Sequence, residues 1–261
     1  MRRGRQCSPA VRARFALVAS ALVVQFAAVA LIAPPTASAE VYTCGNAGTP
    51  NYEDGYVDER NIDYYEGAYA YIKTEYGAVC DTDTSNANFT AASVSIAGSD
   101  GSGFAESGFV RWYGSSITYF AQQWDGGNDL QTRYANQPGI GSVHGYYEKW
   151  QTTTGDIKSI VDATTFLTSS WDPFSDWDLP FEPQFLGSAY YLESDIAGDS
   201  SAPTAYTNLH GQDYITNAWD SYPCSVLTKV NNGSAERSDG EEWYDSISTC
   251  PSFNVYTDNA P

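Results

Sequence analysis

Histidine is scarce in this chain of 261 residues, which contains only two, His144 and His210. Zinc sites and serine-nucleophile relays commonly use imidazole, so the chain has little material for either. No H-E-x-x-H sequence, C-x-x-C pair or EF-hand loop is present. Acidic clusters at 195–199 and 172–178 offer oxygen ligands for calcium, although a solvated acidic loop is their simpler interpretation. The sequence therefore predicts no cofactor and no metal ion.

The usual sequence contexts of a catalytic serine are missing as well. There is no G-x-S-x-G elbow. Residues 198–203, GDSSAP, superficially resemble the nucleophile segment of chymotrypsin-like proteases. They lack the two glycines that follow the serine there, and no Ala-Ala-His-Cys-like segment lies upstream. We interpret this segment as a turn built from residues that favour turns.

Positive charge is also scarce, with 13 basic residues against 32 acidic ones and a formal net charge of −19. Nucleic acids and anionic membrane surfaces attract clustered cations, so neither is expected as a partner. The expected partner is instead a polypeptide or polysaccharide outside the cell, bound by a monomer. An acidic surface of this kind suits solubility outside the cell.

The first 39 residues have the pattern of a secretory signal peptide. An arginine-rich start precedes an apolar run at 15–32, and Ala37-Ser38-Ala39 provides a small-residue cleavage site. The alternative is a transmembrane anchor, because the run is about long enough to begin spanning a bilayer. The break at Pro34-Pro35 and the cleavage site favour removal. We therefore expect a secreted, extracellular protein without a stable membrane anchor.

Cysteine usage agrees with secretion, because an even number remains once Cys7 is removed with the leader. An even count in a secreted chain predicts two disulfides, and four cysteines allow three connectivities. We favour pairing within the first two and within the last two. The four are Cys44, Cys80, Cys224 and Cys250.

No stretch with helical periodicity follows the leader. Short runs rich in aromatic and β-branched residues alternate with Gly, Asn, Asp and Ser turns, which indicates an all-β fold. We predict an antiparallel β-sandwich or jelly roll of the concanavalin A-like type, with a loop-rich C-terminal extension. The domains are the signal peptide 1–39, an irregular lead-in 40–62, the β-sandwich 63–219 and a disulfide-tied extension 220–261. The expected strands are 64–76, 90–97, 104–113, 116–124, 143–152, 156–162, 184–193 and 203–210, with a hairpin connecting 147–150 to 156–158.

Glu106 is the strongest candidate for chemistry. It lies in the predicted strand FAESGFVRW, where alternation gives it one face with Phe104, Gly108, Val110 and Trp112. A carboxylate on an apolar face loses hydration, so its pKa should rise unless it is paired. Such a group can act as a general acid or base. The simpler interpretation is a carboxylate held in a satisfied hydrogen-bond network.

The segments 93–98 and 104–109, followed by a strand at Tyr119-Phe120, resemble the first half of the glutamic peptidases. That group includes the scytalidopepsin-like and neprosin-like families, and secreted bacterial proteins share the layout over roughly residues 64–219. The resemblance implies a concanavalin-type sandwich with a Gln or Glu two residues before a Gly on one strand. It also implies a distant Glu that activates water. Glu106 matches the first of these positions.

The second position falls in Gly187-Ser188-Ala189, where the related pattern has Gly-Glu and this chain has Ser188. Serine is not a comparable base without a neighbouring histidine or lysine. Three alternatives follow. Glu106 works with Glu148 or Glu193, or with Gln184 or Gln122 and a tyrosine, or the site is inactive and the sandwich binds a ligand.

The resemblance implies a secreted peptidase that acts by general acid/base catalysis at acidic pH, with an atypical or degenerate site. The alternative is a lectin-like module that binds carbohydrate or cell wall without cleaving it. Such modules use exposed aromatic side chains beside polar ones. The candidates here are Trp112, Trp124 and Tyr190.

Overall fold

The structure is a computed structural model, and the account below covers part of the chain. The described residues are 51–57, 65–79, 88–98, 103–127, 130–172, 181–190, 194, 196–199, 201–213, 215–222, 226–231, 242–249 and 252–258. Within these ranges the named elements are antiparallel β-strands, and no α-helix is present. None of the described elements is therefore a helix long and apolar enough to cross a bilayer.

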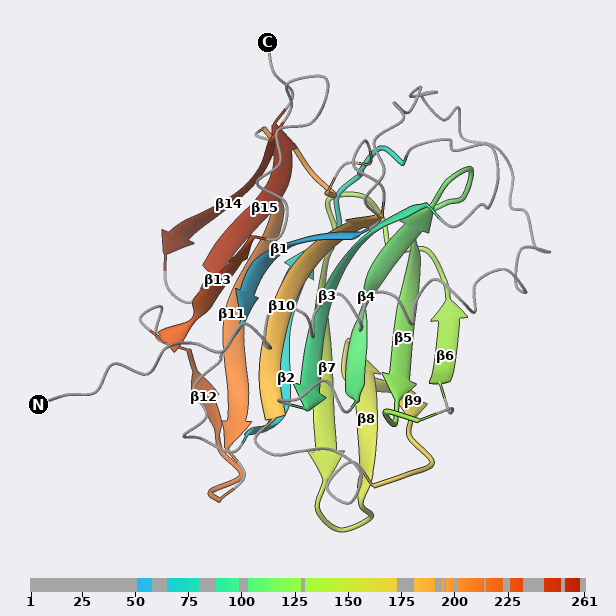
Figure 1. Ribbon diagram of the computed structural model, residues 1–261, viewed down its shortest axis with the longest axis vertical. Coiled ribbons are helices and arrows are strands. Elements are labelled where there is room, and N and C mark those ends of the chain that lie inside the picture. Colours follow the sequence, from blue (N-terminus) through green and yellow to red (C-terminus); the bar gives the residue numbers. More distant parts are fainter. Residues whose placement is uncertain are drawn as a thin grey trace, which may run out of the picture.

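The strands form two sheets that lie face to face, with the seven-stranded sheet in front in Figure 1. In spatial order the seven-stranded sheet contains β13 (Thr228–Asn231), β1 (Asn51–Val57), β10 (Phe181–Tyr190), β3 (Phe89–Gly98), β4 (Phe104–Trp112), β5 (Thr118–Trp124) and β6 (Leu130–Ala135). The eight-stranded sheet contains β14 (Glu242–Thr249), β15 (Ser252–Asp258), β11 (Thr204–Asp213), β2 (Tyr65–Lys73), β7 (Val143–Gln151), β8 (Asp156–Val161) and β9 (Thr164–Thr168), and β12 (Trp219–Ser221) pairs with β11. This architecture is the predicted antiparallel β-sandwich.

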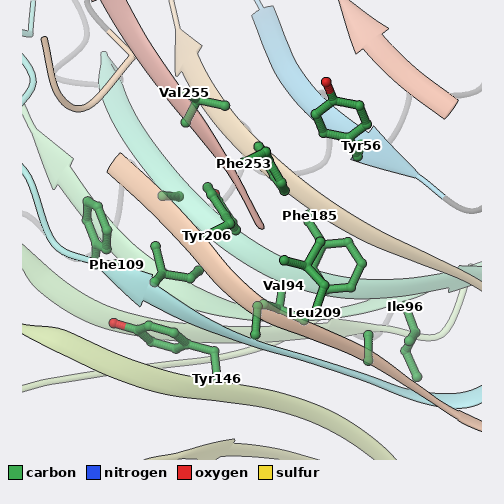
Figure 2. Packing of buried hydrophobic residues seen from close by; sticks show 14 of the residues in the cluster. Tyr56, Val94, Ile96, Phe109, Tyr146, Phe185, Tyr206, Leu209, Phe253 and Val255 are labelled. Atoms are coloured by element: carbon green, nitrogen blue, oxygen red, sulfur yellow. The ribbon is translucent and has the colours of Figure 1, made fainter. Parts of the chain in front are cut away.

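The main hydrophobic core lies between the sheets. Val94 and Phe109 from the seven-stranded sheet pack in one cluster with Tyr146 and Leu209 from the eight-stranded sheet. Figure 2 shows these side chains between the two layers. A strand buried on one face alternates between core and outer positions, so membership of this cluster identifies the inner face of each strand.

The predicted strands correspond to β2–β5, β7, β8, β10 and β11, within a few residues at their ends. The predicted hairpin is confirmed, because β7 and β8 pair and Gly155 adopts φ 72° in the turn between them. Glycine enters this left-handed region without the penalty that a Cβ imposes. The sequence therefore located the strands whose alternation is regular.

Strands also form where the sequence predicted an irregular lead-in and a loop-rich extension. β1 lies between β13 and β10, and β15 pairs with both β11 and β14. β6 and β9 are further strands that the sequence reading omitted. The four cysteines of the predicted disulfides, Cys44, Cys80, Cys224 and Cys250, lie outside the described residues.

Candidate active site on the seven-stranded sheet

Strand β4 places Glu106 on the outer face of the seven-stranded sheet. Ala105 and Phe109 belong to the core between the sheets. Val110 belongs instead to a smaller cluster, with Trp112 packed against it, and every member of that cluster comes from the seven-stranded sheet. Successive strand residues point to opposite faces, so Glu106 shares the outer face with Val110 and Trp112. The predicted face of Glu106 is confirmed.

Glu106 is the centre of a polar row that crosses the sheet. Its directly opposite neighbours are Ser95 on β3 and Gln122 on β5. Ser95 is in turn opposite Gln184 on β10, and Ser95 Oγ donates a hydrogen bond of 3.2 Å to Gln184 Oε1. Register therefore brings Glu106 and Gln184 to either side of Ser95, with all three side chains on one face.

Gly108 lets β3 and β4 approach closely beside this row. A Cβ at Gly108 would lie 2.0 Å from the backbone oxygen of Ala92 and 2.8 Å from the Cα of Ser93. These atoms belong to the backbone of β3, so they could not move aside as a flexible side chain could. The glycine two residues after Glu106 is thus required by strand packing at this point.

Burial raises the pKa of Glu106 to about 7. The Gln122 amide and the Ser93 hydroxyl favour the charged form and offset part of that rise. Loss of hydration raises the pKa of the Tyr134 phenol above its ordinary value, and the charge of nearby Glu106 raises it further. Tyr134 is therefore a neutral hydroxyl beside a carboxyl that titrates near neutrality.

Glu148 lies on the other side of β4. It is fully buried between the sheets, and its Oε2 accepts a 2.7 Å hydrogen bond from Ser159 Oγ. Ser159 Oγ also accepts a 2.9 Å bond from Gln123 Nε2. Burial raises the pKa of Glu148 well above its ordinary value; Ser107 and Ser159 oppose this, and the charge of Glu106 adds to it. The two carboxyl groups influence each other through the sheet but do not face a common cleft.

Ser188 shares the outer face of β10 with Gln184 but lies four residues farther along the strand, opposite Ala91. At about 3.4 Å per residue this is a displacement of roughly 14 Å along the sheet. Gln184, rather than Ser188, is the β10 residue in register with Glu106. Glu193 lies outside the described residues.

The two described aromatic candidates flank this face. Trp112 packs edge-on against Tyr134, with ring centroids 5.1 Å apart. The Trp124 ring lies 6.0 Å from that of Phe104, and its Nε1 donates to Gly127 O. Both tryptophans are half-buried. The side chain of Tyr190 lies outside the described part of the structure.

A buried tyrosine ties the candidate row to the opposite sheet. Tyr206 Oη, from β11, accepts a 3.1 Å hydrogen bond from Ser93 N–H and donates a 2.6 Å bond to Leu186 O. Ser93 on β3 and Leu186 on β10 are directly opposite each other, so the Tyr206 hydroxyl bridges these two strands from the core side of the sheet. Leu186 lies midway between Gln184 and Ser188.

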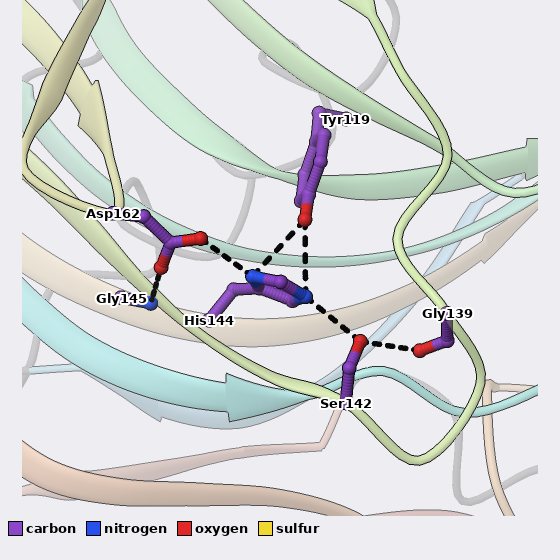
Figure 3. Close-up of polar contacts among 6 residues, drawn as sticks. All are labelled: Tyr119, Gly139, Ser142, His144, Gly145 and Asp162. Carbon is purple, nitrogen blue, oxygen red and sulfur yellow. Dashed lines mark hydrogen bonds and ion pairs between the residues drawn. The ribbon is translucent and has the colours of Figure 1, made fainter.

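Sequence reasoning missed a second polar cluster, formed by Ser142, His144 and Asp162 and shown in Figure 3. The signal in the sequence is the Ser-x-His spacing, with Ser142 directly before β7 and His144 within it. Among the described residues of the GDSSAP segment, Asp199 Oδ1 accepts hydrogen bonds from Ser201 N–H and Ala202 N–H, as in the expected turn. In the described part of the chain, no group of three or more His, Cys, Asp or Glu side chains is arranged to hold a metal ion.

Solved structures with a similar architecture include two peptidases. Scytalido-glutamic peptidase with a peptide-based transition-state analogue superposes with a TM-score of 0.53 and 9% sequence identity, over 79% of this chain and 98% of that one. SCP-B, a member of the eqolisin family of peptidases in complex with the tripeptide Ala-Ile-His, gives 0.51 and 9% over the same shares. No protein-family model and no curated protein sequence matches the chain. The chain thus has a glutamic-peptidase-like fold.

Proposed function

We propose that this protein is a secreted, glutamic-peptidase-like hydrolase that cleaves peptide bonds with Glu106 as its general base. The observation that carries the proposal is the Glu106–Ser95–Gln184 row, in which a carboxyl with a pKa of about 7 stands across from a fixed amide. The similarity of fold to glutamic peptidases supports the reaction class.

In the proposed reaction, the ionised Glu106 carboxylate takes a proton from a water molecule, whose oxygen attacks the peptide carbonyl carbon. Ser95 holds the oxygen of the Gln184 amide, which leaves the Nε2 hydrogens to stabilise the developing oxyanion. Glu106 then gives its proton to the leaving amine as the carbon–nitrogen bond breaks. The base thus lies on β4, at the first family position, and the amide lies on β10, four residues before Ser188 at the second.

The raised pKa favours activity near neutral pH over the acidic optimum that the family resemblance implied. A general base must be ionised, so kcat/KM should rise with pH through about 7. The predicted signal peptide and the acidic composition support an extracellular substrate. The register of the Glu106–Ser95–Gln184 row supports a single cleavage site on the outer face of the seven-stranded sheet.

The test is cleavage of a denatured protein by the purified mature chain. Glu106→Gln is expected to lower kcat/KM by roughly 10²–10⁴-fold, the contribution of a general base. Gln184→Leu should lower kcat but keep the rise of kcat/KM through about pH 7, because Glu106 is still present. Asp220→Asn, on an exposed strand, is the matched control. Unchanged cleavage by the Glu106 variant, or its loss only in Glu148→Gln, would overturn the assignment.

The same preparations distinguish the lectin-like alternative. A binding module would be retained on insoluble polysaccharide, lose retention when Trp112 or Trp124 is replaced by Ala, and cleave no peptide at any pH. A hydrolase would show cleavage that depends on Glu106. The two outcomes depend on different side chains and can therefore be told apart.

A further inference from the structure

Ser142, His144 and Asp162 form a hydrogen-bonded chain at one end of the sandwich. Ser142 Oγ lies 2.7 Å from His144 Nε2, and His144 Nδ1 lies 2.6 Å from Asp162 Oδ2. Nε2 thus has the Ser142 hydroxyl as a partner and Nδ1 has the Asp162 carboxylate, and the Tyr119 hydroxyl lies near both nitrogens (Figure 3). This is the order of groups that activates a serine nucleophile, and such a relay is recognised by geometry and not by sequence position.

Local backbone structure fixes all three side chains. Gly141 has φ 78° in a tight turn closed by a 3.0 Å bond from Ser142 N–H to Gly139 O, and β7 begins directly after it. Asp162 has φ 48° in the turn between β8 and β9. Its Oδ1 accepts a 2.9 Å bond from Gly145 N–H, and its own N–H donates back to Gly145 O at 2.9 Å. The carboxylate is therefore held before any ligand arrives.

Tyr119 covers the imidazole from the seven-stranded sheet. Its hydroxyl is 3.0 Å from both ring nitrogens of His144, and the two rings are 84° apart. Equal distances to both nitrogens place the hydroxyl over the ring face, since both in-plane directions are occupied by Ser142 and Asp162. Burial, assisted by the charge of Asp162, raises the pKa of Tyr119 to about 12, so the phenol stays neutral. Tyr119 is a positioning residue.

The cluster is reachable from solvent. The His144 side chain is 18% exposed and that of Asp162 is 52% exposed. The apolar side chains of Ile140 and Val143, on either side of Gly141-Ser142 in the chain, are also 63% and 56% exposed.

We propose that Ser142 is the nucleophile of a second hydrolytic site, which transfers the acyl group of small activated esters. Ser142 Oγ attacks the ester carbonyl carbon while its proton passes to His144 Nε2, and Asp162 stabilises the imidazolium. His144 returns the proton to the leaving alkoxide as the carbon–oxygen ester bond breaks. Water then hydrolyses the acyl-serine by the same proton route, and Ser142 is regenerated.

The choice of activated esters follows from the surrounding amides. The Ser142 N–H is engaged inside the turn with Gly139 O, and the Gly141 N–H donates to Thr74 O, just after β2. Neither is available for an oxyanion, and one missing donor of this kind costs roughly 10²–10³-fold in rate. Ser142 Oγ also touches Gly139 O, and its single hydrogen can serve only one acceptor at a time. An activated ester has a good leaving group, which compensates for slow attack by Ser142. An amide has a poor leaving group and would not be cleaved at this site.

The proposal is tested by covalent labelling with a fluorophosphonate probe and by hydrolysis of p-nitrophenyl acetate. The unmodified chain should incorporate one probe on the peptide containing Ser142, as identified by mass spectrometry. Ser142→Ala should abolish labelling, and Asp162→Asn should slow it at least tenfold while hydrolysis falls in parallel. Ser221→Ala, on an exposed strand, and Glu106→Gln should label at the original rate.

Labelling elsewhere, labelling that survives Ser142→Ala, or equal rates in Asp162→Asn would overturn the proposal. Thermal melts identify variants that fail to fold. Ser142→Cys provides a second test if Ser142→Ala is unstable, because a thiol at this position should react with iodoacetamide faster than in the Asp162→Asn background. Equal thiol reactivity in the two backgrounds would also refute a relay. Since the Glu106 variant retains this site, failure here is separate from failure of the peptidase proposal.

Discussion

At the scale of single residues, Glu66 resembles Glu106, because each is a carboxyl group that strand alternation places among apolar side chains. Ala68, Ala70 and Ile72 of β2 face the core, and Glu66 continues that face. Both its carboxyl oxygens are buried and have no hydrogen-bond partner among the described residues. Glu66 already lies within the strand that the sequence predicts at 64–76, so its place on the face of Ala68 could be inferred from alternation. Chain-distant partners such as Asp162 could not be found this way, because only strand pairing brings them to His144.

Burial raises the pKa of Glu66 to about 7, partly offset by the positive charge of Lys149. The unfolded chain ionises near 4.5 while the folded protein keeps its proton, so stability falls as pH rises from about 4.5 to about 7. Glu66→Gln removes this loss. We expect the variant to be about 1–3 kcal/mol more stable than the original at pH 8 and nearly equal at pH 4.5, as measured by urea unfolding. A stability difference independent of pH would contradict this account.

At the scale of elements, regular alternation made β4, β7 and β8 predictable, whereas β1 was not. The sequence of β1, NYEDGYV, is polar and contains Gly55 at φ 152°, where a Cβ would lie 2.2 Å from Phe185 O. Its strand form comes from pairing with β10 and β13 on both sides. Tertiary pairing therefore overrides local propensity, which is a recurring limit of reading strands from sequence.

The contact between β3 and β4 provides a test at this scale. Gly108→Ala inserts a methyl group against the backbone of β3, so the two strands must separate at the Glu106 row. We expect a loss of roughly 1–3 kcal/mol in unfolding free energy. Gly127→Ala is the control, because its nearest neighbour is the exposed Asp125 side chain at 3.3 Å, and it should change stability by less than about 0.5 kcal/mol. Equal effects would show that β3 and β4 tolerate a wider spacing.

At the scale of the whole molecule, buried and exposed carboxyl groups act together on stability. The pKa values of Glu66, Glu106 and Glu148 are all raised by burial. The net charge of −19 adds self-repulsion as pH rises. In the other direction, turn hydrogen bonds lower the pKa values of Asp199 and Asp213, so their stabilisation is lost as pH falls below the ordinary value of 3.8.

Stability should therefore peak on the acidic side, between about pH 4 and pH 5.5, and fall toward both extremes. Thermal melts across the pH range measure this profile. Added salt at pH 8 should recover the share due to surface repulsion, because it screens exposed charges, but not the share due to buried carboxyls. A maximum above pH 7 would contradict the assignment of raised pKa values to the three glutamates.

The contacts of Tyr206 determine how late in synthesis the candidate row can be fully supported. It joins β3 to β10 beside the candidate row, and its ring stacks on Phe253 of β15 with centroids 4.5 Å apart. Residues 93, 186, 206 and 253 thus meet at one place, although 160 positions separate the first from the last. A ribosome must translate residue 253 before that meeting can occur, so the contacts that support the row from the core side are completed only after β15 has been made.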